Sequence, residues 1–494
     1  MCAVEVTSSA ETSGLFLGLD VGTQGTKAVL IGEEGVVARA SRSYGLLEGL
    51  SAGAAEQHPD TRIEAARECV GDVIKGRDRD LISAVGVSGQ QHGFVALGAD
   101  GQVLCPAKLW CDTSTSGQAA ELSALLGRHV PTGFTASKVL WLKQCEPQTF
   151  AKLRHVLLPH DYLNYRLTGE FSMEPGDASG TGFYDVTKQA WDRQAQDAID
   201  SNLHTYLPTV KKVGELAGLV DEGGAKLFGL AEGTPVSTGG GDNMMSAIGS
   251  GAVEEGVVVL SLGTSGTVFS YAQESLADPR GWIASFCGSA GGWLPLLCVM
   301  NLTGVTEEVR ASSGLSHEEL CRAAAKVSAG CDGLRWLPFL AGERVPDLPD
   351  ATGTLLGMRP GCLSPARLYR AAIEGTSYNL AWGIEQMREM GVAIEELRLV
   401  GGAAENLLWR QILADVCEVP VRVLKESESA ALGAALQAKW AYGRRQNVSL
   451  TITEVANPYV HLVGEPTSPG PAAAAYREHR AQFAEDLRVH HGVC

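Results

Sequence analysis

The chain has 494 residues, of which 45% are hydrophobic and 20% charged, and its formal net charge is −17 with a pI near 5.2. This length favours two domains over one, and the acidic balance argues against a nucleic-acid-binding protein or one held on an anionic membrane. Residues 1–14 lack the basic region and apolar core of a signal peptide, so we expect a short disordered lead and a cytoplasmic protein.

The first predicted element is a strand–turn–strand unit. Leu15–Leu19 is an apolar strand that ends at Asp20, and Lys27–Ile31 is the next strand. The intervening turn, Gly22–Thr26, has glycines that let the backbone approach a ligand. Its N–H groups and hydroxyls can hold a phosphate, and Asp20 can hold Mg²⁺ directly or through water. The alternative is a structural hairpin with a capping Asp; Lys27 either reaches the phosphate or is a solvated strand lysine.

The rest of the first half predicts strands followed by a block of helices, that is, a parallel-sheet core carrying a helical insertion. A helix capped by Asp60 or Thr61 follows a third strand. Gly233–Gly241 is expected to be a hinge or turn between the halves. The remaining predicted strands are 36–44, 82–87 and 94–97, and the predicted helices are 118–126, 136–144 and 160–167.

The second half begins with a helix from Asp242 to Ala252 and then repeats the opening unit. Val257–Leu262 leads into the turn Gly263–Thr267, whose GTSGT sequence matches the earlier GTQGT. We interpret this as an internal duplication in which two related domains each offer a phosphate loop to a shared cleft. Later elements are predicted helices at 365–390, 407–416, 428–442 and 472–487 and strands at 397–400 and 419–424.

Two polar motifs suit a sugar substrate. Asp242 follows three glycines and is either the group that accepts a hydroxyl proton or simply a helix N-cap. Gln91 and His92 follow a strand and supply the donors and acceptors that sugar hydroxyls need, unless His92 is an ordinary turn histidine.

Aromatic and charged residues nearby have both functional and structural interpretations. Trp110 and Asp112 are either a further substrate-facing pair or an edge tryptophan and a turn aspartate. Lys138 and Trp141 lie one helical turn apart and are compatible with a structural role.

Other classes of site lose their main support. The dipeptide Gly-Lys never occurs, so there is no G-x-x-x-x-G-K-[ST] loop, and G-x-G-x-x-G is absent as well. The 12 cysteines form no C-x-x-C pair, which is typical of small buried side chains in a reducing compartment.

Taken together, ten segments resemble the FGGY carbohydrate kinases of the actin/hexokinase/Hsp70-like ATPase superfamily. The resemblance covers about residues 15–442 and rests on LGLDVGTQGTKAVLI (17–31), AEQHPD (55–60), VSGQQHG (87–93), KLWCDT (108–113), FTASKVLWLK (134–143), LLPHDYLNYRLTGE (157–170), GGGDN (239–243), LSLGTSG (260–266), LPFLAGERVP (337–346) and GGAAENLLWRQILADV (401–416).

The resemblance implies an α/β fold of two ribonuclease H-like domains with a nucleotide cleft between them. It implies an FGGY N-terminal domain at 15–243, which binds the sugar, and a C-terminal domain at 244–490, which carries the adenosine pocket. Asp242 would be the general base and Asp20 the metal-associated aspartate. The substrate-binding residues would be Gln91, His92, Asp242, Asn243, Trp110 and Asp112. The ATP-binding residues would be Gly22, Thr23, Gln24, Lys27, Gly263, Thr264, Ser265, Gly401, Gly402, Ala403 and Asn406.

The implied activity is transfer of the γ-phosphoryl of ATP, with Mg²⁺, to the 5-hydroxyl of D-xylulose. D-ribulose or another polyol is the alternative within the class, and Gln91 bears on this choice because the family's bacterial pattern has Met there. An actin-like or Hsp70-like ATPase with a binding or assembly role is the alternative from another class, and it does not need the sugar-facing motifs. Partners are small molecules, not nucleic acid or membrane, and the interpretation is compatible with a homodimer.

Overall fold

The first large sheet contains the GTQGT turn. The computed structural model describes residues 14–493; residues 1–13, which include most of the expected lead, and residue 494 lie outside this range. The strand order is β13-β14-β5-β1-β2-β3, with β15 also paired to β5. The strands are β1 (Leu15–Val21), β2 (Gly25–Gly32), β3 (Gly35–Ser43), β5 (Ile82–Gly89), β13 (Leu216–Leu219), β14 (Pro235–Ser237) and β15 (Gly240–Gly241).

This sheet is mixed, so the prediction of a parallel core holds only for its centre, where β1, β5 and β14 run parallel, and not for β2 and β3. Strand β1 pairs antiparallel with β2 and parallel with β5. The turn between β1 and β2 is too short for the crossover that a parallel pair needs. The predicted hinge at Gly233–Gly241 is wrong, because this segment supplies β14 and β15, which both pair with β5.

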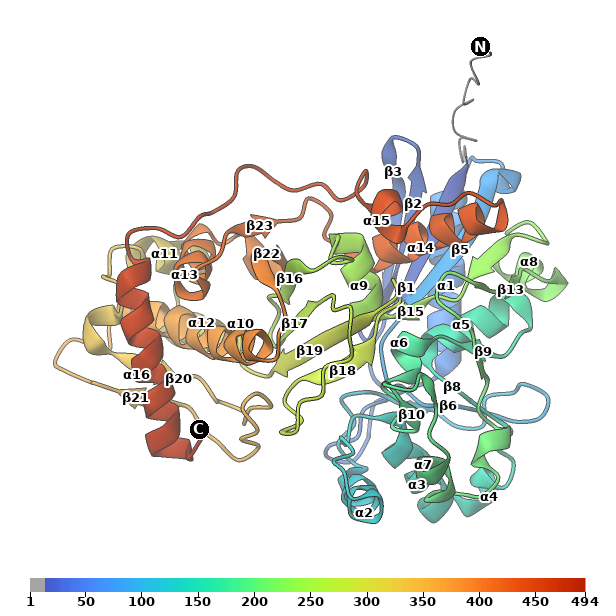
Figure 1. Ribbon diagram of the computed structural model, residues 1–494, viewed down its shortest axis with the longest axis horizontal. Coiled ribbons are helices and arrows are strands. Elements are labelled where there is room, and N and C mark those ends of the chain that lie inside the picture. The colour runs from blue at the N-terminus through green and yellow to red at the C-terminus, as the bar shows by residue number, and fades with distance from the viewer. Residues whose placement is uncertain (1–13, 494) are drawn as a thin grey trace, which may run out of the picture. The chain divides into compact units, whose positions relative to one another are not determined.

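Helices cover both faces of the first sheet. Helix α1 (Pro59–Ile74) begins after His58, not after Asp60 or Thr61, and Pro59 occupies its first turn, where a missing N–H costs nothing. Apolar side chains of α1 share a core with Leu17 and Leu19 of β1. Helix α14 (Ser429–Arg445) packs on β1 and β5, and Figure 1 shows it beside these blue strands although it lies near the end of the chain.

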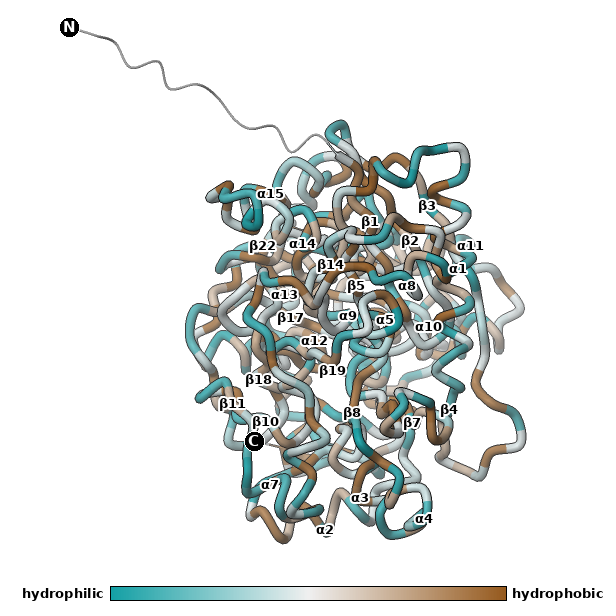
Figure 2. Tube along the Cα trace, turned by 90° about the vertical axis from the view of Figure 1, so that its right-hand side faces the viewer, coloured by the Kyte–Doolittle hydropathy of each residue, from teal (hydrophilic) through white to brown (hydrophobic). Residues whose placement is uncertain are grey.

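Two glycines explain how closely α14 approaches the sheet. A Cβ atom at Gly18 of β1 would lie 1.9 Å from the Ala431 carbonyl oxygen, and one at Gly86 of β5 would lie 2.0 Å from that of Ala434. The strands therefore accept only glycine at these two points. The hydrophobic tube of β1 in Figure 2 marks the surrounding apolar layer.

Helix α9 (Asp242–Ser250), which begins at the predicted base, packs against α14 in the same glycine-dependent way. A Cβ atom at Gly249 would lie 1.9 Å from the Ser429 carbonyl oxygen, and one at Gly433 would lie 1.8 Å from that of Met245. Position and orientation of α9 therefore depend on a helix nearly two hundred residues away in sequence.

The helical insertion forms a smaller core of its own. Helices α2 (Ser116–Leu126), α3 (Thr135–Cys145) and α5 (Pro159–Thr168) confirm the three predicted helices within one or two residues at each end. Buried side chains from α2 and α3, including Leu122 and Leu140, pack with Phe94 and Phe183. The strand predicted at 94–97 is β6 (Val95–Leu97), which pairs with β8 (His155–Leu157) and not with the large sheet.

The second large sheet repeats the arrangement of the first. Its order is β18-β19-β17-β16-β22-β23, and β16 is antiparallel to β17 and parallel to β22. This is the arrangement of β1 with β2 and β5, so the two GT-x-GT turns join equivalent strands, which supports the duplication. The strands are β16 (Gly256–Ser261), β17 (Gly266–Ser270), β18 (Ala284–Cys287), β19 (Trp293–Val299), β22 (Ile394–Val400) and β23 (Val421–Val423).

Helices of the second half pack on this sheet. The long helix α12 (Pro365–Glu389), α13 (Leu407–Cys417) and α16 (Ala473–His491) share a core with β16 and β22. Helix α10 (Thr303–Ser313) also contributes to this core and starts beside the GTSGT turn.

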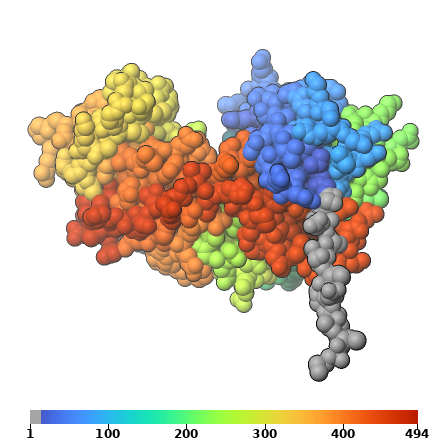
Figure 3. Space-filling view, turned by 90° about the horizontal axis from the view of Figure 1, so that it is seen from above, coloured from blue at the N-terminus to red at the C-terminus, as the bar shows by residue number. Residues whose placement is uncertain are grey.

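The described residues form two compact units that are discontinuous in sequence. The first contains residues 14–251, 287–291 and 428–459, and the second contains 252–286, 292–427 and 460–493. Figure 3 shows orange-red atoms of the last part of the chain directly beside blue atoms of its beginning, and Tyr459 donates to the Gly32 carbonyl. No helix among residues 14–493 is long and apolar enough to cross a membrane.

Candidate active site

Asp20 lies where β1 approaches the GTQGT turn. It pairs in register with Ser88 of β5, whose hydroxyl donates to Asp20 Oδ1 at 2.8 Å. Burial raises the pKa of Asp20, while Ser88 and the charge of Lys27 oppose this rise. A buried carboxylate with one oxygen held by a hydroxyl is a suitable ligand for a hard cation.

Side chains from several elements fix the GTQGT turn. The Gln57 amide donates to the Thr23 carbonyl at 2.7 Å, and the Tyr44 hydroxyl donates to the Gly22 carbonyl at 2.9 Å. Trp110 Nε1 donates to Thr23 Oγ1 at 3.0 Å. Trp110 thus reaches the predicted phosphate turn, and sequence reasoning missed the roles of Gln57 and Tyr44, although Gln57 belongs to the AEQHPD motif.

Lys27 and Asp112 have protein partners. Lys27 Nζ lies 2.5 Å from a carboxylate oxygen of Glu428, in an ion pair at the start of α14. Asp112 is fully buried; its Oδ2 accepts from the Ala55 N–H and from Lys108, and its Oδ1 accepts from Ser114. Both carboxylate oxygens of Asp112 are therefore held within the protein.

Asp242 is the first residue of α9. The N-cap is Gly241, so the interpretation of Asp242 as a cap is wrong. Its Oδ1 accepts from the Asn243 N–H at 2.8 Å and from Asn243 Nδ2 at 3.0 Å. Desolvation, together with the charge of Asp20, raises the pKa of Asp242 to about 8, and the hydrogen bonds from Asn243 oppose this rise. The side chain is partly exposed and suits proton transfer near neutral pH.

The Asn243 amide connects Asp242 with the strand-end motif. Asn243 Nδ2 also donates to Gln91 Oε1 at 2.9 Å. Gln91 is buried, and its Nε2 has no partner among residues 14–493. A Cβ atom at Gly241 would lie 2.6 Å from Gln91 Cγ, so a glycine is needed there. The structure therefore brings four predicted residues into one unit: Asp20, Gln91, Asp242 and Asn243.

His92 follows Gln91 with an unusual backbone. Its φ is +64°, in the left-handed region that residues other than glycine seldom adopt. The imidazole lies against the ring of Phe134, with 4.7 Å between centroids. The residue therefore presents its ring from a fixed turn.

Sequence reasoning missed a buried group of ionisable side chains in this unit. His160 Nδ1 lies 2.6 Å from Asp177 Oδ2, and the Ser289 hydroxyl donates to Glu174 Oε2 at 2.9 Å. Burial raises the pKa of Glu174 to about 7 and that of Asp177 to about 6, and hydrogen bonds from His160 and the His92 N–H oppose the rise at Asp177. The signal was present as two acids among small residues in EPGDASG (174–180).

The second unit holds the GTSGT turn and the predicted adenosine residues. The N–H groups at the start of α10 fix the turn: Thr303 donates to the Gly263 carbonyl and Leu302 to that of Thr264, both at 3.1 Å. Gly401 has φ +93°, and a Cβ there would lie 2.7 Å from the Leu262 carbonyl oxygen. Gly402 faces open space, because no atom of the described residues lies within 4 Å of the position that a Cβ would take there.

The helix predicted at 407–416 is confirmed as α13 (Leu407–Cys417). A short 3₁₀ turn, η4 (Gly402–Glu405), comes first, and Asn406 is the N-cap of α13, with its Oδ1 accepting from the Trp409 N–H at 3.1 Å. Ala403 lies in η4. The backbone N–H groups that can bind a ligand at this point are therefore those of the 3₁₀ turn and of the first turn of α13.

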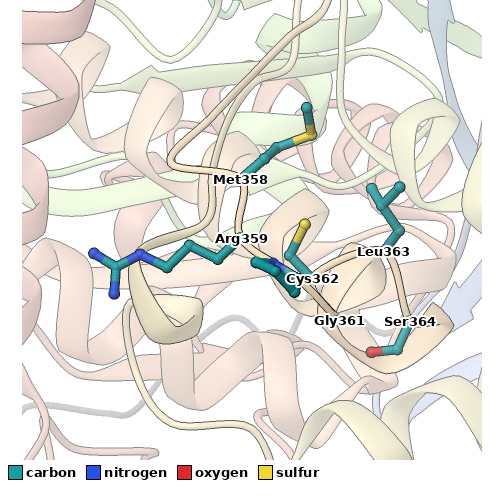
Figure 4. Close-up of a pocket in the computed structure, with 7 residues that line it drawn as sticks. Met358, Arg359, Gly361, Cys362, Leu363 and Ser364 are labelled. Carbon is teal, nitrogen blue, oxygen red and sulfur yellow. The ribbon is translucent and has the colours of Figure 1, made fainter.

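Other features of the described residues carry no predicted site. A hollow of about 520 Å³ on the loop before α12 is lined by residues 358–364 alone, and Figure 4 shows the Arg359 side chain pointing away from the neighbouring Leu363. No group of three or more His, Cys, Asp or Glu residues between 14 and 493 can hold a metal ion.

Comparison with known proteins places the fold and site in a family. The model of the FGGY family of carbohydrate kinases, N-terminal domain, matches residues 15–249, and that of the C-terminal domain matches residues 258–442. The chain belongs to the FGGY family of carbohydrate kinases and is an ATP-dependent sugar kinase. The predicted two-domain fold is confirmed.

Individual relatives show which members of this family the chain is similar to. The chain is 40% identical over 469 residues to the xylulose kinase of Haemophilus influenzae, covering 91% of this chain and 94% of that protein. It is 34% identical to the xylulose kinase of Escherichia coli, covering 81% and 84%. A crystal structure of a xyloylose kinase from Brucella ovis superposes with a TM-score of 0.89 at 28% identity, covering 97% and 99%.

Proposed function

We propose that this enzyme transfers the γ-phosphoryl group of ATP to the 5-hydroxyl of D-xylulose, giving D-xylulose 5-phosphate. The observation that carries the proposal is the hydrogen-bonded chain Gln91–Asn243–Asp242, which joins sugar-type donors and acceptors to one proton-accepting carboxylate. The choice of sugar is supported by the relatives, which are named xylulose kinases at 34–40% identity over most of this chain.

Asp242 is the proposed general base. A positioned base is typically worth roughly a hundred- to ten-thousand-fold in rate. Asn243 donates to Asp242 Oδ1 and leaves the other carboxylate oxygen for the reacting hydroxyl. The raised pKa of about 8 gives a stronger base than an ordinary aspartate.

Gln91 and His92 are the proposed contacts to the remaining hydroxyls. The buried Gln91 Nε2, without a partner among the described residues, is a donor that a sugar oxygen can satisfy. For Trp110 and Asp112 we propose only an indirect contribution to the substrate side, because Trp110 bonds Thr23 and the Asp112 carboxylate is held by Ala55, Lys108 and Ser114.

The nucleotide is proposed to bind residues of both halves. Gly22, Thr23 and Gln24 in the first turn and Gly263, Thr264 and Ser265 in the second would hold its phosphates through backbone N–H groups and hydroxyls. Lys27, on β2, would reach a phosphate through its ammonium group. Gly401, Gly402, Ala403 and Asn406 would border adenosine. We assign residues 15–243 to the N-terminal domain and 244–490 to the C-terminal domain, in a cytoplasmic enzyme that is compatible with a homodimer.

The chemistry at Asp20 fits Mg²⁺. Asp20 and Asp242 both carry a carboxylate, and the negative charge of Asp20 disfavours the negative charge of Asp242. A divalent cation would relieve this repulsion. Because Mg²⁺ commonly uses one or two carboxylates together with phosphate and water oxygens, a large protein ligand set is not needed. When bound, the ion would supply neutralisation of phosphate charge.

The test is ATP consumption over a panel of D-xylulose, D-ribulose, glycerol and longer ketoses, with the product identified by NMR. We expect the highest kcat/KM for D-xylulose and phosphorylation at C5. A higher kcat/KM for D-ribulose would change the assigned sugar and leave the assignment as a sugar kinase intact. D-ribulose is the main alternative because Gln91 stands where the family's bacterial pattern has Met. ATP turnover that is independent of every sugar would favour an actin-like or Hsp70-like ATPase.

A further inference from the structure

The conformation of His92 raises the question of what holds it. A positive φ at a residue other than glycine costs free energy and persists only when its surroundings maintain it. Two backbone groups of His92, and one face and one edge of its ring, have neighbours that the proposed reaction does not otherwise use. These partners come mostly from the first turn of α3.

The His92 carbonyl has two donors from α3. Lys138 Nζ donates to it at 2.9 Å, and Thr135 Oγ1 donates at 3.2 Å. Lys138 Nζ also donates to the Gly133 carbonyl, so one ammonium joins the His92 turn to the loop that precedes α3. Both side chains are fully buried.

Burying the charged Lys138 ammonium costs free energy, because the group loses its hydration. Among residues 14–493, the Lys138 ammonium forms no ion pair, and its acceptors are the backbone carbonyls of His92 and Gly133. Burial lowers the pKa of Lys138 to about 7, opposed by the charge of Asp112. A methionine or leucine would fill the space without this penalty, so the charge is best explained by the carbonyls it holds.

The imidazole of His92 is seated as tightly as its backbone. Phe134, also from the start of α3, packs on the ring. At the Nδ1–Cε1 edge of the ring, a Cβ atom at Gly180 would lie 2.0 Å from both ring atoms, Cε1 and Nδ1 of His92. The His92 N–H bonds the Asp177 carboxylate. Any other residue at position 180 would displace the ring.

We propose that Lys138 and Thr135 are positioning residues for sugar recognition: by holding the His92 carbonyl, they keep the Gln91–His92 turn in the conformation that presents both side chains to the substrate. Neither touches the reacting atoms. The inference rests on the proposed role of Gln91 and His92, and it gives a function to the FTASKVLWLK segment.

The central test is a double-mutant cycle between positions 138 and 92. Lys138→Met removes the ammonium and keeps the length of the side chain. We expect it to raise the KM for the best sugar of the panel about tenfold, the effect of losing a charged hydrogen bond, with the KM for ATP changed less than about twofold. In the His92→Ala background, the same change should lower the sugar kcat/KM by a smaller factor than in the unaltered enzyme, because only Gln91 is then left for the turn to present.

A matched control lies on the same helix. Lys143 also bonds a backbone carbonyl, that of Ile199, but its ion pair with Asp200 is partly exposed. Lys143→Met should leave both KM values unchanged, since exposed pairs contribute little. Melting temperatures and circular dichroism of all variants establish that they are folded.

Two further variants keep the proposal testable should Lys138→Met not fold. Thr135→Val removes the second donor at nearly constant volume, and Gly180→Ala displaces the ring from its Nδ1–Cε1 edge. Each should raise the sugar KM and spare the ATP KM. The proposal is overturned by equal losses for sugar and ATP, or by a Lys138→Met effect that is undiminished in His92→Ala. Unchanged sugar kinetics in His92→Ala alone would overturn the proposed role of His92 as well, whereas a different preferred sugar would overturn only the D-xylulose assignment.

Discussion

At the scale of single residues, the site holds two carboxylates, Asp20 and Asp242, whose pKa values are raised. Burial raises the pKa of Asp20, and burial together with the charge of Asp20 raises the pKa of Asp242 to about 8. Acidic residues with shifted pKa values are concentrated at catalytic sites, although structural ion-pair networks shift pKa values too. Asp242 is the acid whose partner, Asn243, also reaches Gln91, which favours a functional cause.

Replacing Asp242 by Asn removes the proton acceptor and keeps the size of the side chain. We expect kcat to fall roughly a hundred- to ten-thousand-fold, the usual contribution of a general base, with the KM for ATP nearly unchanged. Steady-state kinetics at saturating sugar measure this. Turnover close to that of the unaltered enzyme would remove Asp242 from the reaction.

The same substitution has a pH-dependent effect on stability. Between its usual pKa near 3.8 and about 8, folded Asp242 keeps a proton that the unfolded chain releases. Stability of the unaltered protein therefore falls as pH rises through this window, and an Asn side chain escapes the loss. The melting temperature of Asp242→Asn, relative to the unaltered protein, should be higher at about pH 9 than at about pH 5. An equal difference at both pH values would contradict the raised pKa.

At the scale of elements, close packing of α14 on α9 positions the start of α9. Gly433 and Gly249 let the two helix backbones approach, and α14 also lies on β1 and β5, which carry Asp20 and Ser88. The contact therefore connects the predicted base with the strand ends. A methyl group added at this interface would clash with the facing backbone.

Gly433→Ala tests this element contact. The added Cβ would lie 1.8 Å from the Met245 carbonyl oxygen, so α9 must shift; we expect about 1–3 kcal/mol of destabilisation by denaturant unfolding and a loss of kcat. Gly443→Ala on the same helix is the control, because its Cβ would lie 3.8 Å from Val448 Cβ. If the two variants behave alike, packing at Gly433 does not position α9.

A second element prediction concerns the turn after β22. Because Gly402 faces open space, Gly402→Val should fold and place a branched side chain where adenosine is proposed to lie. We expect a raised KM for ATP and a smaller change for the sugar. Unaltered ATP kinetics in a folded variant would remove Gly402 from the nucleotide site.

At the scale of the whole molecule, the two sheets share one plan. Strand β1 with β2 and β5, and β16 with β17 and β22, show the same antiparallel and parallel neighbours around a GT-x-GT turn. The hydroxyls of Thr23 and Thr264 occupy matching places in the two turns. The shared cleft that this repetition suggests stays a prediction.

If both turns bind phosphates of one nucleotide, Thr23→Val and Thr264→Val should each raise the KM for ATP. Loss of one hydroxyl contact predicts an increase of about three- to tenfold. The double variant should depart from the product of the single effects, because both groups would act on one ligand. A KM for ATP that responds to only one of the two substitutions would separate the turns.

Much of this protein is determined locally and was therefore predictable from sequence. The two glycine turns, the apolar strands before them and the helices of the insertion depend on neighbouring residues, because turn chemistry and hydrophobic periodicity act over a few positions. The motifs also predicted Asp20, Gln91, Asp242 and Asn243, which the structure brings into one unit.

Contacts between distant segments were decided only by tertiary structure. Nothing local in residues 428–459 indicates that they join the first unit, and nothing local pairs His160 with Asp177 or places Lys138 on the His92 carbonyl. The same holds for Asp112, whose carboxylate is used by Ala55 and Lys108. The sequence determines where charged residues and glycines stand along the chain. The packing of remote helices and strands decides which partners these residues contact once buried. The reason is that the folded state is stabilised by the sum of all contacts and not by the preference of any one segment.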